Sequence, residues 1–387
     1  MGELIKKFVH VITELKKKEN KSIFQVLPEI LNYSSRLGLS PGEYFTYGFH
    51  SKTATKSYCL DYMPNKVHFK RHLATLNSSN RAILNDKILF KNAMQEANIP
   101  IPRTIGYAGP SKRSDLNFEL ITLSTIQETL SIHKITSFIV KPSNGTGGKG
   151  IYLVKYSAGE NRPFNIKNQS MNTTDFFEYL TQNCEDLNGG YILFEYKVSS
   201  NDVLKEISPD ASPNIRVITL RLPNGDIHVT SASMRLGRKN SITSNACSGG
   251  LVAGIDVKSG SIVNCRTTEN IQGEFISNHP DTSSKIAGVN IPKWGDVLST
   301  CIKAASAVES MKSVGWDVLL DNDSPVIIEG NDQWSIISEQ MFDEGYLTPK
   351  NRELLAFYGL EFPKKNIPKP SLSNLKIALF GSGGKDF

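Results

Sequence analysis

The sequence predicts a protein that combines helices with antiparallel strands, an α+β fold. Two strand-like runs, NIRVITLRL and DIHVTSASMRL, are joined by Pro223-Asn224-Gly225, which is typical of a hairpin turn. A second pair of runs, GWDVLL and PVIIEGN, flanks a short Asp-Asn-Asp-Ser turn. With 387 residues the chain is long enough for two or three domains of about 150 residues, each able to bury its own core.

The composition is that of a globular protein and excludes several function classes. Apolar residues make up 39% and charged residues 21% of the chain, which argues against a disordered, collagenous or coiled-coil protein. The net charge of +6 is too small and too diffuse to indicate a nucleic-acid-binding protein. The five cysteines form no C-x-x-C pair, so the sequence predicts neither a disulfide framework nor a zinc knuckle. Reduced thiols are typical of the cytosol, and we therefore expect a cytoplasmic protein.

Residues 1–84 have a helical pattern, with breaks at Pro28, at residues 38–42 and at Pro64, and they predict a helical N-terminal region. Within it, residues 1–20 combine an apolar stripe with flanking lysines, a pattern that also suits a helix lying on an anionic membrane surface. A surface helix that packs its stripe against the protein is the more common design, and we favour it. The chain has no apolar run of about 20 residues and no signal-peptide cleavage site, so we expect neither a membrane span nor secretion.

The middle of the chain alternates helices with strands. Residues 86–97 predict a helix, and the run IPIPRTIGY that follows predicts the start of a strand. A helix near residues 124–132 precedes the strands SFIVKP and IYLVKY, and a helix around residues 173–184 precedes the strand YILFEY. After the hairpin, a helix from about residue 294 to 310 leads into the last two strands, and residues 371–387 predict a flexible tail rich in Gly and Ser.

Gly145, Gly147 and Gly150 form a G-x-G-x-x-G pattern between two of these strands. A dinucleotide-binding fingerprint requires a helix after the loop, whereas the next residues, IYLVK, alternate as a strand does. A Walker loop is excluded as well, because Lys149 is followed by glycine rather than by Ser or Thr. Two interpretations stay open: a loop whose backbone N–H groups bind phosphate, or an ordinary flexible hairpin. Lys141, at the end of the preceding strand, would add a positive charge for the same phosphates.

Acidic residues gather in the last predicted hairpin. Glu329 and Asn331 are two residues apart, so their side chains leave a strand on the same face. If the turn after Asp321 takes three residues, Asp317 lies directly across from Glu329, with Cβ atoms about 5 Å apart. Two carboxylates and an amide oxygen brought together favour Mg²⁺, and an acidic hairpin edge open to water is the alternative. Asp321 and Asp323 are interpreted as turn formers only.

Together these motifs resemble the ATP-grasp superfamily over roughly residues 86–340. Asp86-Lys87 at a helix start is similar to the first ATP-lysine motif, IVKPSNGTGGKG to the second lysine with its phosphate-covering loop, and FEYKV to the hinge that receives adenine. The family's magnesium triad is similar in spacing to Asp317, Glu329 and Asn331. Within the superfamily, three stretches resemble the subgroup called sugar-transfer-associated, which is found with polysaccharide biosynthesis. They are SPNIRVITLRLPNGDIHVTSASMRLG, ACSGGLVAGIDVKSGSI and GWDVLLDNDSPVIIEGN.

The resemblance implies an ATP-grasp fold, in which two α+β lobes hold ATP between them. We expect a helical N-terminal region at residues 1–84 and a small lobe with the glycine-rich phosphate loop at residues 85–197. A large lobe with the magnesium site is expected at residues 198–370, followed by the tail at residues 371–387. The implied ligands are ATP and Mg²⁺.

The resemblance also implies a role for each matching residue. The ATP-binding residues are Lys87, Lys141, Asn144, Gly145, Thr146, Gly147, Gly148, Lys149, Gly150, Glu195, Tyr196, Val198 and Asp202. The two lysines contact phosphates beneath the glycine loop. Glu195 holds adenine together with the backbone of Tyr196 and Val198. The Ser-Ser-Asn-Asp context of Asp202 suits a helix cap or a loop as well as it suits a ribose contact. The magnesium ligands are Asp317, Glu329 and Asn331, and the catalytic residues are Arg216, Arg235 and Lys141.

Three arginines are candidates for stabilising charge on the transferred phosphate or for holding an anionic acceptor: Arg216, Arg235 and Arg238. Arg238 is the weakest of them, because strand arginines often pair only at the surface. The sequence departs from the family after Asn331, where DQW stands in place of a nearby arginine. Backbone donors that could replace it belong to Ser248, Gly249 and Gly250, which equally suit a plain glycine turn.

The function implied by the resemblance is that of an ATP-dependent carboxylate–amine ligase, which forms an amide through an acyl phosphate. The carboxylate would belong to a uronic acid or another sugar acid, whether free, nucleotide-linked or lipid-linked, and the amine to an amino acid or amino alcohol. Two alternatives remain: a kinase that phosphorylates a hydroxyl, and a non-catalytic nucleotide-binding protein anchored by its N-terminal helix. No nucleic-acid partner is expected.

Overall fold

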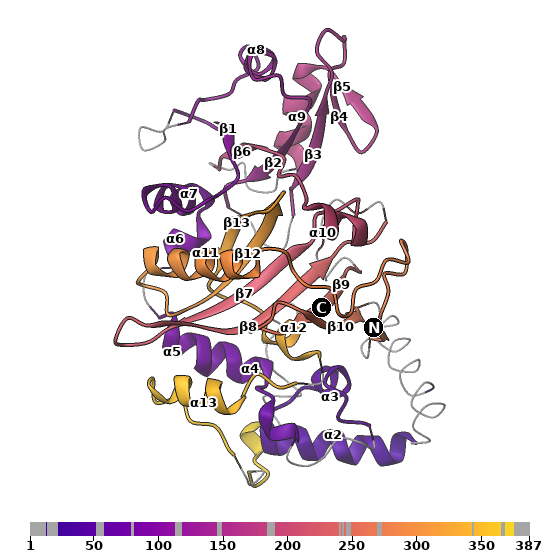
Figure 1. The fold of residues 1–387 in the computed structure, drawn as a ribbon, viewed down its shortest axis with the longest axis vertical. Coiled ribbons are helices and arrows are strands. Elements are labelled where there is room, and N and C mark those ends of the chain that lie inside the picture. The colour runs from indigo at the N-terminus through magenta and orange to yellow at the C-terminus, as the bar shows by residue number, and fades with distance from the viewer. Residues whose placement is uncertain are drawn as a thin grey trace.

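The computed structural model describes residues 13, 22–51, 58–78, 81–112, 118–144, 149–183, 190–239, 241, 244, 249–268, 273–342, 344–364 and 368–374. Two antiparallel sheets follow one another along the longest axis of the molecule, and helices cover the side of the larger sheet that faces away from the smaller one (Figure 1). The prediction of an α+β fold is confirmed.

The smaller sheet, at the top of Figure 1, has six strands in the described part of the chain, in the order β1-β6-β2-β3-β4-β5. These are β1 (Thr104–Ala108), β2 (Ser137–Pro142), β3 (Tyr152–Tyr156), β4 (Phe164–Ile166), β5 (Gln169–Met171) and β6 (Ile192–Tyr196). Helices α8 (Ile126–Ile132) and α9 (Thr173–Asn183) contribute Leu130 and Phe176 to its core. Because β2 and β3 pair antiparallel, the glycine-rich segment joins two neighbouring strands, as predicted.

The larger sheet has the strand order β11-β10-β9-β8-β7-β12-β13 among the described residues. Its strands are β7 (Asn214–Arg221), β8 (Ile227–Leu236), β9 (Leu251–Ile255), β10 (Ile262–Thr267), β11 (Phe275–Ile276), β12 (Ser313–Asp321) and β13 (Ser324–Asn331). Both predicted hairpins, β7–β8 and β12–β13, are confirmed.

The two faces of the larger sheet bury different apolar clusters. Ile215 and Val217 of β7 pack with α11 (Trp294–Ala307), α6 (Ala82–Asn85) and α7 (Lys87–Glu96). Ile218 and Leu220 pack with helices from both ends of the chain. Those helices are α2 (Ile23–Leu37), α3 (Pro41–Thr46), η1 (Tyr58–Asp61), α4 (Asn65–Val67), η2 (His68–Leu73), α5 (Ala74–Leu76), α12 (Ile336–Gln340) and α13 (Pro349–Ala356). The described helices of the N-terminal region therefore share a core with this sheet.

No helix within the described ranges is long and apolar enough to span a membrane. The helix predicted within residues 1–20 and the tail after residue 374 lie outside the described residues.

Two histidines are buried in the cluster between the larger sheet and the N-terminal helices. His68 and His72 lie one turn apart in η2, with their Nδ1 atoms 2.9 Å from each other, and His68 Nε2 lies 2.8 Å from the Trp334 carbonyl oxygen. Burial lowers the pKa of His68 to about 3 and holds the pKa of His72 well below its usual value. Both rings are therefore neutral in the folded protein near neutral pH.

We expect this histidine pair to make the fold sensitive to mild acid. The unfolded chain binds protons at both histidines below pH about 6.5, whereas the native pair does not. The free energy of unfolding should fall by about 1.4 kcal/mol per histidine for each pH unit below that value. Urea unfolding at several pH values measures the slope, which His72→Phe should roughly halve. The exposed His133 is the control, and a His133→Gln change that lowered the slope equally would contradict the assignment.

Candidate active site

The candidate site lies at the junction of the two sheets, where α7, the end of β2 and the β12–β13 hairpin come together (Figure 1). Asp86 caps α7, because its carboxylate accepts from the Ile88 backbone N–H at 2.7 Å. The N–H of Lys87 donates to the Ser143 carbonyl oxygen at 3.0 Å. The backbone of Lys87, the first predicted ATP lysine, is therefore attached just after β2, the strand that carries Lys141, the second predicted lysine.

A buried cluster of charges connects these two elements with β6. Lys141 Nζ lies 2.9 Å from one carboxylate oxygen of Glu195, and Lys91 Nζ lies 2.6 Å from the other. Burial alone would raise the pKa of Glu195, but the two ammonium groups outweigh it and lower that pKa. Burial lowers the pKa of Lys87, and nearby Lys141 adds to the effect. Three lysines surround one carboxylate, so the cluster carries excess positive charge.

Lys91 was not predicted, although the sequence contains a signal for it. It stands four residues after Lys87, so both side chains leave the same side of α7. Its neighbours on the helix, Ile88, Phe90 and Met94, are all buried. A lysine within a buried apolar stripe requires a partner, and here its Nζ also donates to the Pro102 carbonyl oxygen at 2.9 Å.

The glycine-rich loop is described only at its two ends. Asn144 and Lys149 are exposed, and Gly150 has a φ of 72°, which favours glycine. The remaining predicted loop residues, Gly145, Thr146, Gly147 and Gly148, lie outside the described residues. Phosphate binding by this loop therefore stays a prediction.

The segment after β6, predicted to receive adenine, connects the two sheets. The carboxylate of Glu195 contacts the two lysines, so any adenine contact here would fall to the backbone of Tyr196 and Val198. Asn201, rather than Asp202, caps α10 (Asp202–Ile207), with its side-chain oxygen accepting from the Val203 N–H at 3.0 Å. Asp202 is exposed at the first position of that helix. The Ser-Ser-Asn-Asp segment therefore does contain a helix cap, supplied by Asn201, and the ribose role of Asp202 stays a prediction.

The turn between β12 and β13 does more than reverse the chain. Asp321 accepts from the Ser199 backbone N–H at 3.2 Å, and Asp323 accepts from the Asn201 side-chain amide at 2.7 Å. The interpretation of these two aspartates as turn formers only is therefore wrong. They attach the segment after β6 to the hairpin that carries the candidate magnesium ligands.

The predicted pairing of Asp317 with Glu329 is confirmed, but the chain reaches it differently. The turn has two residues rather than three, and Asn322 there has a φ of 55°. A bulge between the pairs of Asp317 and Val318 then shifts the register by one residue, which brings Asp317 opposite Glu329. Asn331 lies two residues further along β13, and its side-chain N–H donates to Glu329 at 3.3 Å.

Arg216 of β7 holds Asp317 from the other side. Its Nε and Nη2 atoms lie 2.5 and 2.9 Å from the two carboxylate oxygens, and both side chains are buried. Burial would raise the pKa of Asp317, but Arg216 outweighs it and lowers that pKa to about 2. Burial and the neighbouring Asp317 carboxylate raise the pKa of Glu329. The hairpin therefore holds one firmly ionised carboxylate beside one that resists ionisation.

This donor set fits Mg²⁺, which binds through hard oxygen atoms. The raised pKa of Glu329 reports a repulsion between carboxylates that a bound dication would relieve. Within the described ranges no three His, Cys, Asp or Glu side chains form a metal-binding group. Any ion here would therefore rely on the Asn331 amide oxygen and on oxygen atoms of ligands or water, as Mg²⁺ at phosphate sites commonly does.

A second carboxylate, Glu339 of α12, lies near the arginines and was not predicted. It accepts from the Ser231 hydroxyl at 2.6 Å and from the Ser233 hydroxyl at 2.7 Å. Burial raises the pKa of Glu339, while Arg216 and Arg235 oppose that effect. Burial and the positive charge of Arg216 lower the pKa of Arg235. Its Nε is buried and has no hydrogen-bond partner within the described ranges.

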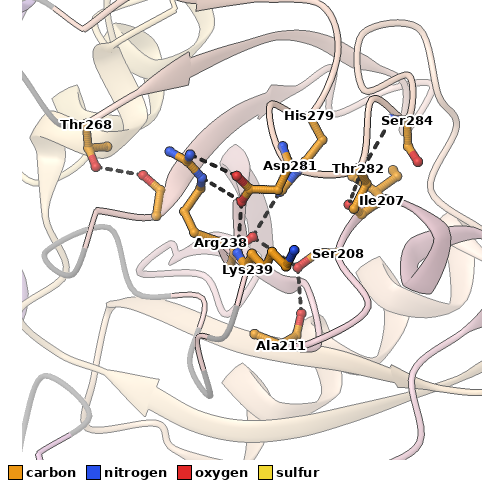
Figure 2. Close-up of polar contacts among 12 residues, drawn as sticks. Ile207, Ser208, Ala211, Arg238, Lys239, Thr268, His279, Asp281, Thr282 and Ser284 are labelled. Atoms are coloured by element: carbon orange, nitrogen blue, oxygen red, sulfur yellow. Dashed lines mark hydrogen bonds and ion pairs between the residues drawn. The ribbon is translucent and has the colours of Figure 1, made fainter.

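Arg238 has a different environment from the other two arginines, and Figure 2 shows its contacts. Its Nε and Nη2 atoms lie 2.8 and 3.0 Å from the carboxylate oxygens of Asp281, which also accepts from the Lys239 N–H at 2.8 Å. This ion pair fixes a loop.

The predicted backbone donors after β8 are described only in part. Gly249 has a φ of 81°, and the Gly250 carbonyl oxygen accepts from Thr268 at 2.6 Å, while Ser248 lies outside the described residues.

Comparisons with known proteins identify the family. Biotin carboxylase from Campylobacter jejuni aligns at 14% identity over 74% of this chain and 49% of its own, with a TM-score of 0.44. D-alanine–D-alanine ligase from Helicobacter pylori aligns at 12% identity over 73% of this chain and 62% of its own, with a TM-score of 0.38. The chain thus spans about half to three fifths of the length of these structures. No curated protein matches it.

A family model described as sugar-transfer associated ATP-grasp matches residues 69–354. This range covers most of the chain and contains both sheets, the lysine cluster and the acidic hairpin. The chain belongs to the sugar-transfer-associated ATP-grasp family.

Proposed function

We propose that the protein is an ATP-dependent ligase that joins a carboxylate to an amine through an acyl phosphate. The observation that carries this proposal is the proximity of the lysine cluster to the acidic hairpin. Burial lowers the pKa of Lys87 and the nearby Glu329 carboxylate opposes that shift, while Glu195 lies between Lys91 and Lys141. Phosphoryl transfer needs positive charge around the phosphates together with oxygen ligands for their metal ion, and the lysine cluster and the hairpin would supply them.

The chain's own residues would position the reactants. Lys87 and Lys141 would neutralise the phosphates of ATP, with the backbone of Tyr196 and Val198 beside adenine. Asp317, Glu329 and Asn331 would hold Mg²⁺, which supplies charge neutralisation when bound. Arg235, whose Nε lacks a partner within the described ranges, would hold the substrate anion.

The chemistry would then proceed in two steps. A substrate carboxylate oxygen attacks the γ-phosphorus, the bond to the β,γ-bridging oxygen breaks, and ADP leaves with the electron pair. The amine next attacks the acyl carbon, phosphate leaves, and the nitrogen loses one proton to water or buffer. Because phosphate is a good leaving group, the second step requires little general-base catalysis from the protein.

The family's association with sugar transfer supports a substrate class. The carboxylate would belong to a uronic acid or another sugar acid, free or linked to a nucleotide or lipid, and the amine to an amino acid or amino alcohol. Amide formation of this kind would modify a surface polysaccharide precursor in the cytoplasm.

Hydroxylamine trapping tests the acyl phosphate. A screen of uronic acids against amines for ADP release identifies a substrate pair, and the product mass should equal the two substrates less one water. With that carboxylate and hydroxylamine in place of the amine, a hydroxamate should accumulate at the rate of ADP release. A phosphorylated product without hydroxamate would instead establish a kinase. Binding of ATP without ADP release in every combination would favour a nucleotide-binding protein.

A further inference from the structure

Helix α2 exposes an uncharged apolar stripe along the edge of the molecule opposite the smaller sheet (Figure 1). Phe24 is 85% exposed, Leu27 47% and Leu31 40%, and their spacing of three and four residues places them on one side of the helix. The two charged residues of α2 have partners within the protein. Glu29 accepts from the Tyr44 hydroxyl, and Arg36 donates to Asn32 at 2.7 Å.

The segment 368–374 attaches to the end of α2 and brings a further exposed apolar side chain. The Ser371 N–H donates to the Ser35 carbonyl oxygen at 2.8 Å, and the Asn374 side chain donates to the Arg36 carbonyl oxygen at 3.1 Å. Leu372, between these two contacts, is 77% exposed. Phe24, Leu27, Leu31 and Leu372 together are called the α2 face.

The stretch that precedes α2 in the sequence and the stretch that contains residues 368–374 are both strongly basic. Residues 1–21 contain six lysines and three glutamates, and residues 364–387 contain five lysines and one aspartate. These stretches therefore account for +7, more than the whole net charge of +6, and the residues between them carry a net charge of −1. The excess positive charge therefore lies, along the sequence, in the stretch that directly precedes α2 and in the stretch that contains the segment attached to its end.

We infer that the α2 face docks on an anionic lipid bilayer. Apolar side chains on one side of a helix enter the boundary between headgroups and acyl chains, while adjacent lysines attract anionic headgroups. A second copy of the chain is a poorer occupant, because it would bring the same basic stretches against this surface. The inference concerns a surface remote from the lysine cluster and the acidic hairpin, and it does not depend on the proposed reaction.

Co-sedimentation of the full chain with vesicles tests the inference. At about 0.1 M salt, vesicles of phosphatidylglycerol and phosphatidylcholine should bind the protein, and vesicles of phosphatidylcholine alone should bind it at least tenfold more weakly. Combining Phe24→Gln, Leu27→Gln and Leu31→Gln should lower the affinity at least about a hundredfold. Phe357→Gln is the matched control, because Phe357 is 65% exposed on another helix end, and it should leave binding unchanged.

A charge variant separates the lipid interaction from damage to the helix. Lys16→Gln, Lys17→Gln and Lys18→Gln leave the α2 face intact and should weaken binding to the anionic vesicles at least about tenfold. Light scattering and melting temperatures check that all variants keep the assembly state and fold of the parent chain. The inference is overturned if the parent chain ignores anionic vesicles, if it binds neutral ones equally, or if the apolar variant binds like the parent. A parent dimer that the apolar variant dissociates, without vesicle binding, would overturn it in favour of self-association.

Discussion

Replacing Glu329 by glutamine should nearly abolish ADP formation while making the folded protein more stable. Burial and the Asp317 carboxylate raise the pKa of Glu329 above its unfolded value, so its ionisation opposes folding as the pH rises beyond about 4.5. Glutamine keeps the shape and the oxygen that accepts from Asn331, but it removes the charge. We expect a gain of about 1–2 kcal/mol in the free energy of unfolding at pH 7.5, and turnover at least a hundredfold lower because phosphate and metal binding need the carboxylate.

The pH dependence of this gain distinguishes charge repulsion from better packing. Below pH about 4 the carboxyl is protonated in both the native and the unfolded chain, so the two proteins should be equally stable there. Glu353→Gln, the same chemical change at an exposed position of α13, should alter both stability and turnover little. Retained turnover in the Glu329 variant would refute the metal assignment, and a loss of stability at neutral pH would refute the repulsion.

The acidic hairpin also indicates how far the sequence alone can reach. Residue spacing and strand pattern predict that Asp317 faces Glu329, and this pairing is confirmed. They predict it through a three-residue turn, whereas the chain uses a two-residue turn and a bulge that together have the same effect on the register. The residue types around the bulge do not indicate it, because the β-branched run in this strand suits regular pairing equally well.

Contacts between distant segments could not be predicted from local patterns. Arg216 and Asp317 are 101 positions apart, and they meet only because β7 and β12 become neighbours in the larger sheet. The sequence marks both residues as candidates for the site but assigns the arginine to the transferred phosphate or to an anionic acceptor. Glu339 lies in a short helix that is distant along the sequence from Ser231 and Ser233, the strand residues that donate to it. Its neighbours in the sequence therefore do not indicate a role.

Other features depended on the choice between two local interpretations. The alternating run after the glycine-rich pattern predicts a strand connection, and the antiparallel pairing of β2 with β3 confirms this. Lys91 was missed because it stands inside an amphipathic helix, where lysines usually face water. Its burial becomes predictable only when the apolar positions on both sides of it are counted toward one face.

Removal of the Arg216 guanidinium should be the most damaging single change in the site. The Arg216→Met chain leaves Asp317 ionised and buried without its bidentate partner, and a broken buried ion pair costs about 3–5 kcal/mol. The Arg238–Asp281 pair offers a matched comparison, because it has the same bidentate chemistry with side chains 28% and 19% exposed instead of 5% and 4%. Arg238→Met should cost only about 0–1 kcal/mol, since exposed pairs contribute little.

The sign of the pH dependence follows from the lowered pKa of Asp317. A carboxyl with a native pKa of about 2 stabilises the fold above its unfolded value, and this contribution is lost as the pH falls toward 2. The difference between the parent and the Arg216→Met chain should therefore be complete above pH about 4 and shrink below it. Urea unfolding at graded pH values measures this difference.

A double substitution separates the loss of charge pairing from the loss of packing. If the unpaired carboxylate causes the damage, Asp317→Asn added to Arg216→Met should restore at least half of the lost stability, because the group that lost its partner is then neutral. If the guanidinium matters through its volume alone, the second change should restore nothing. Equal losses in the Arg216 and Arg238 variants would also contradict the dependence on burial. We expect the double variant to remain folded by this argument. It should still fail to form ADP, because Asp317 would hold the metal ion and Arg216 would orient the acceptor.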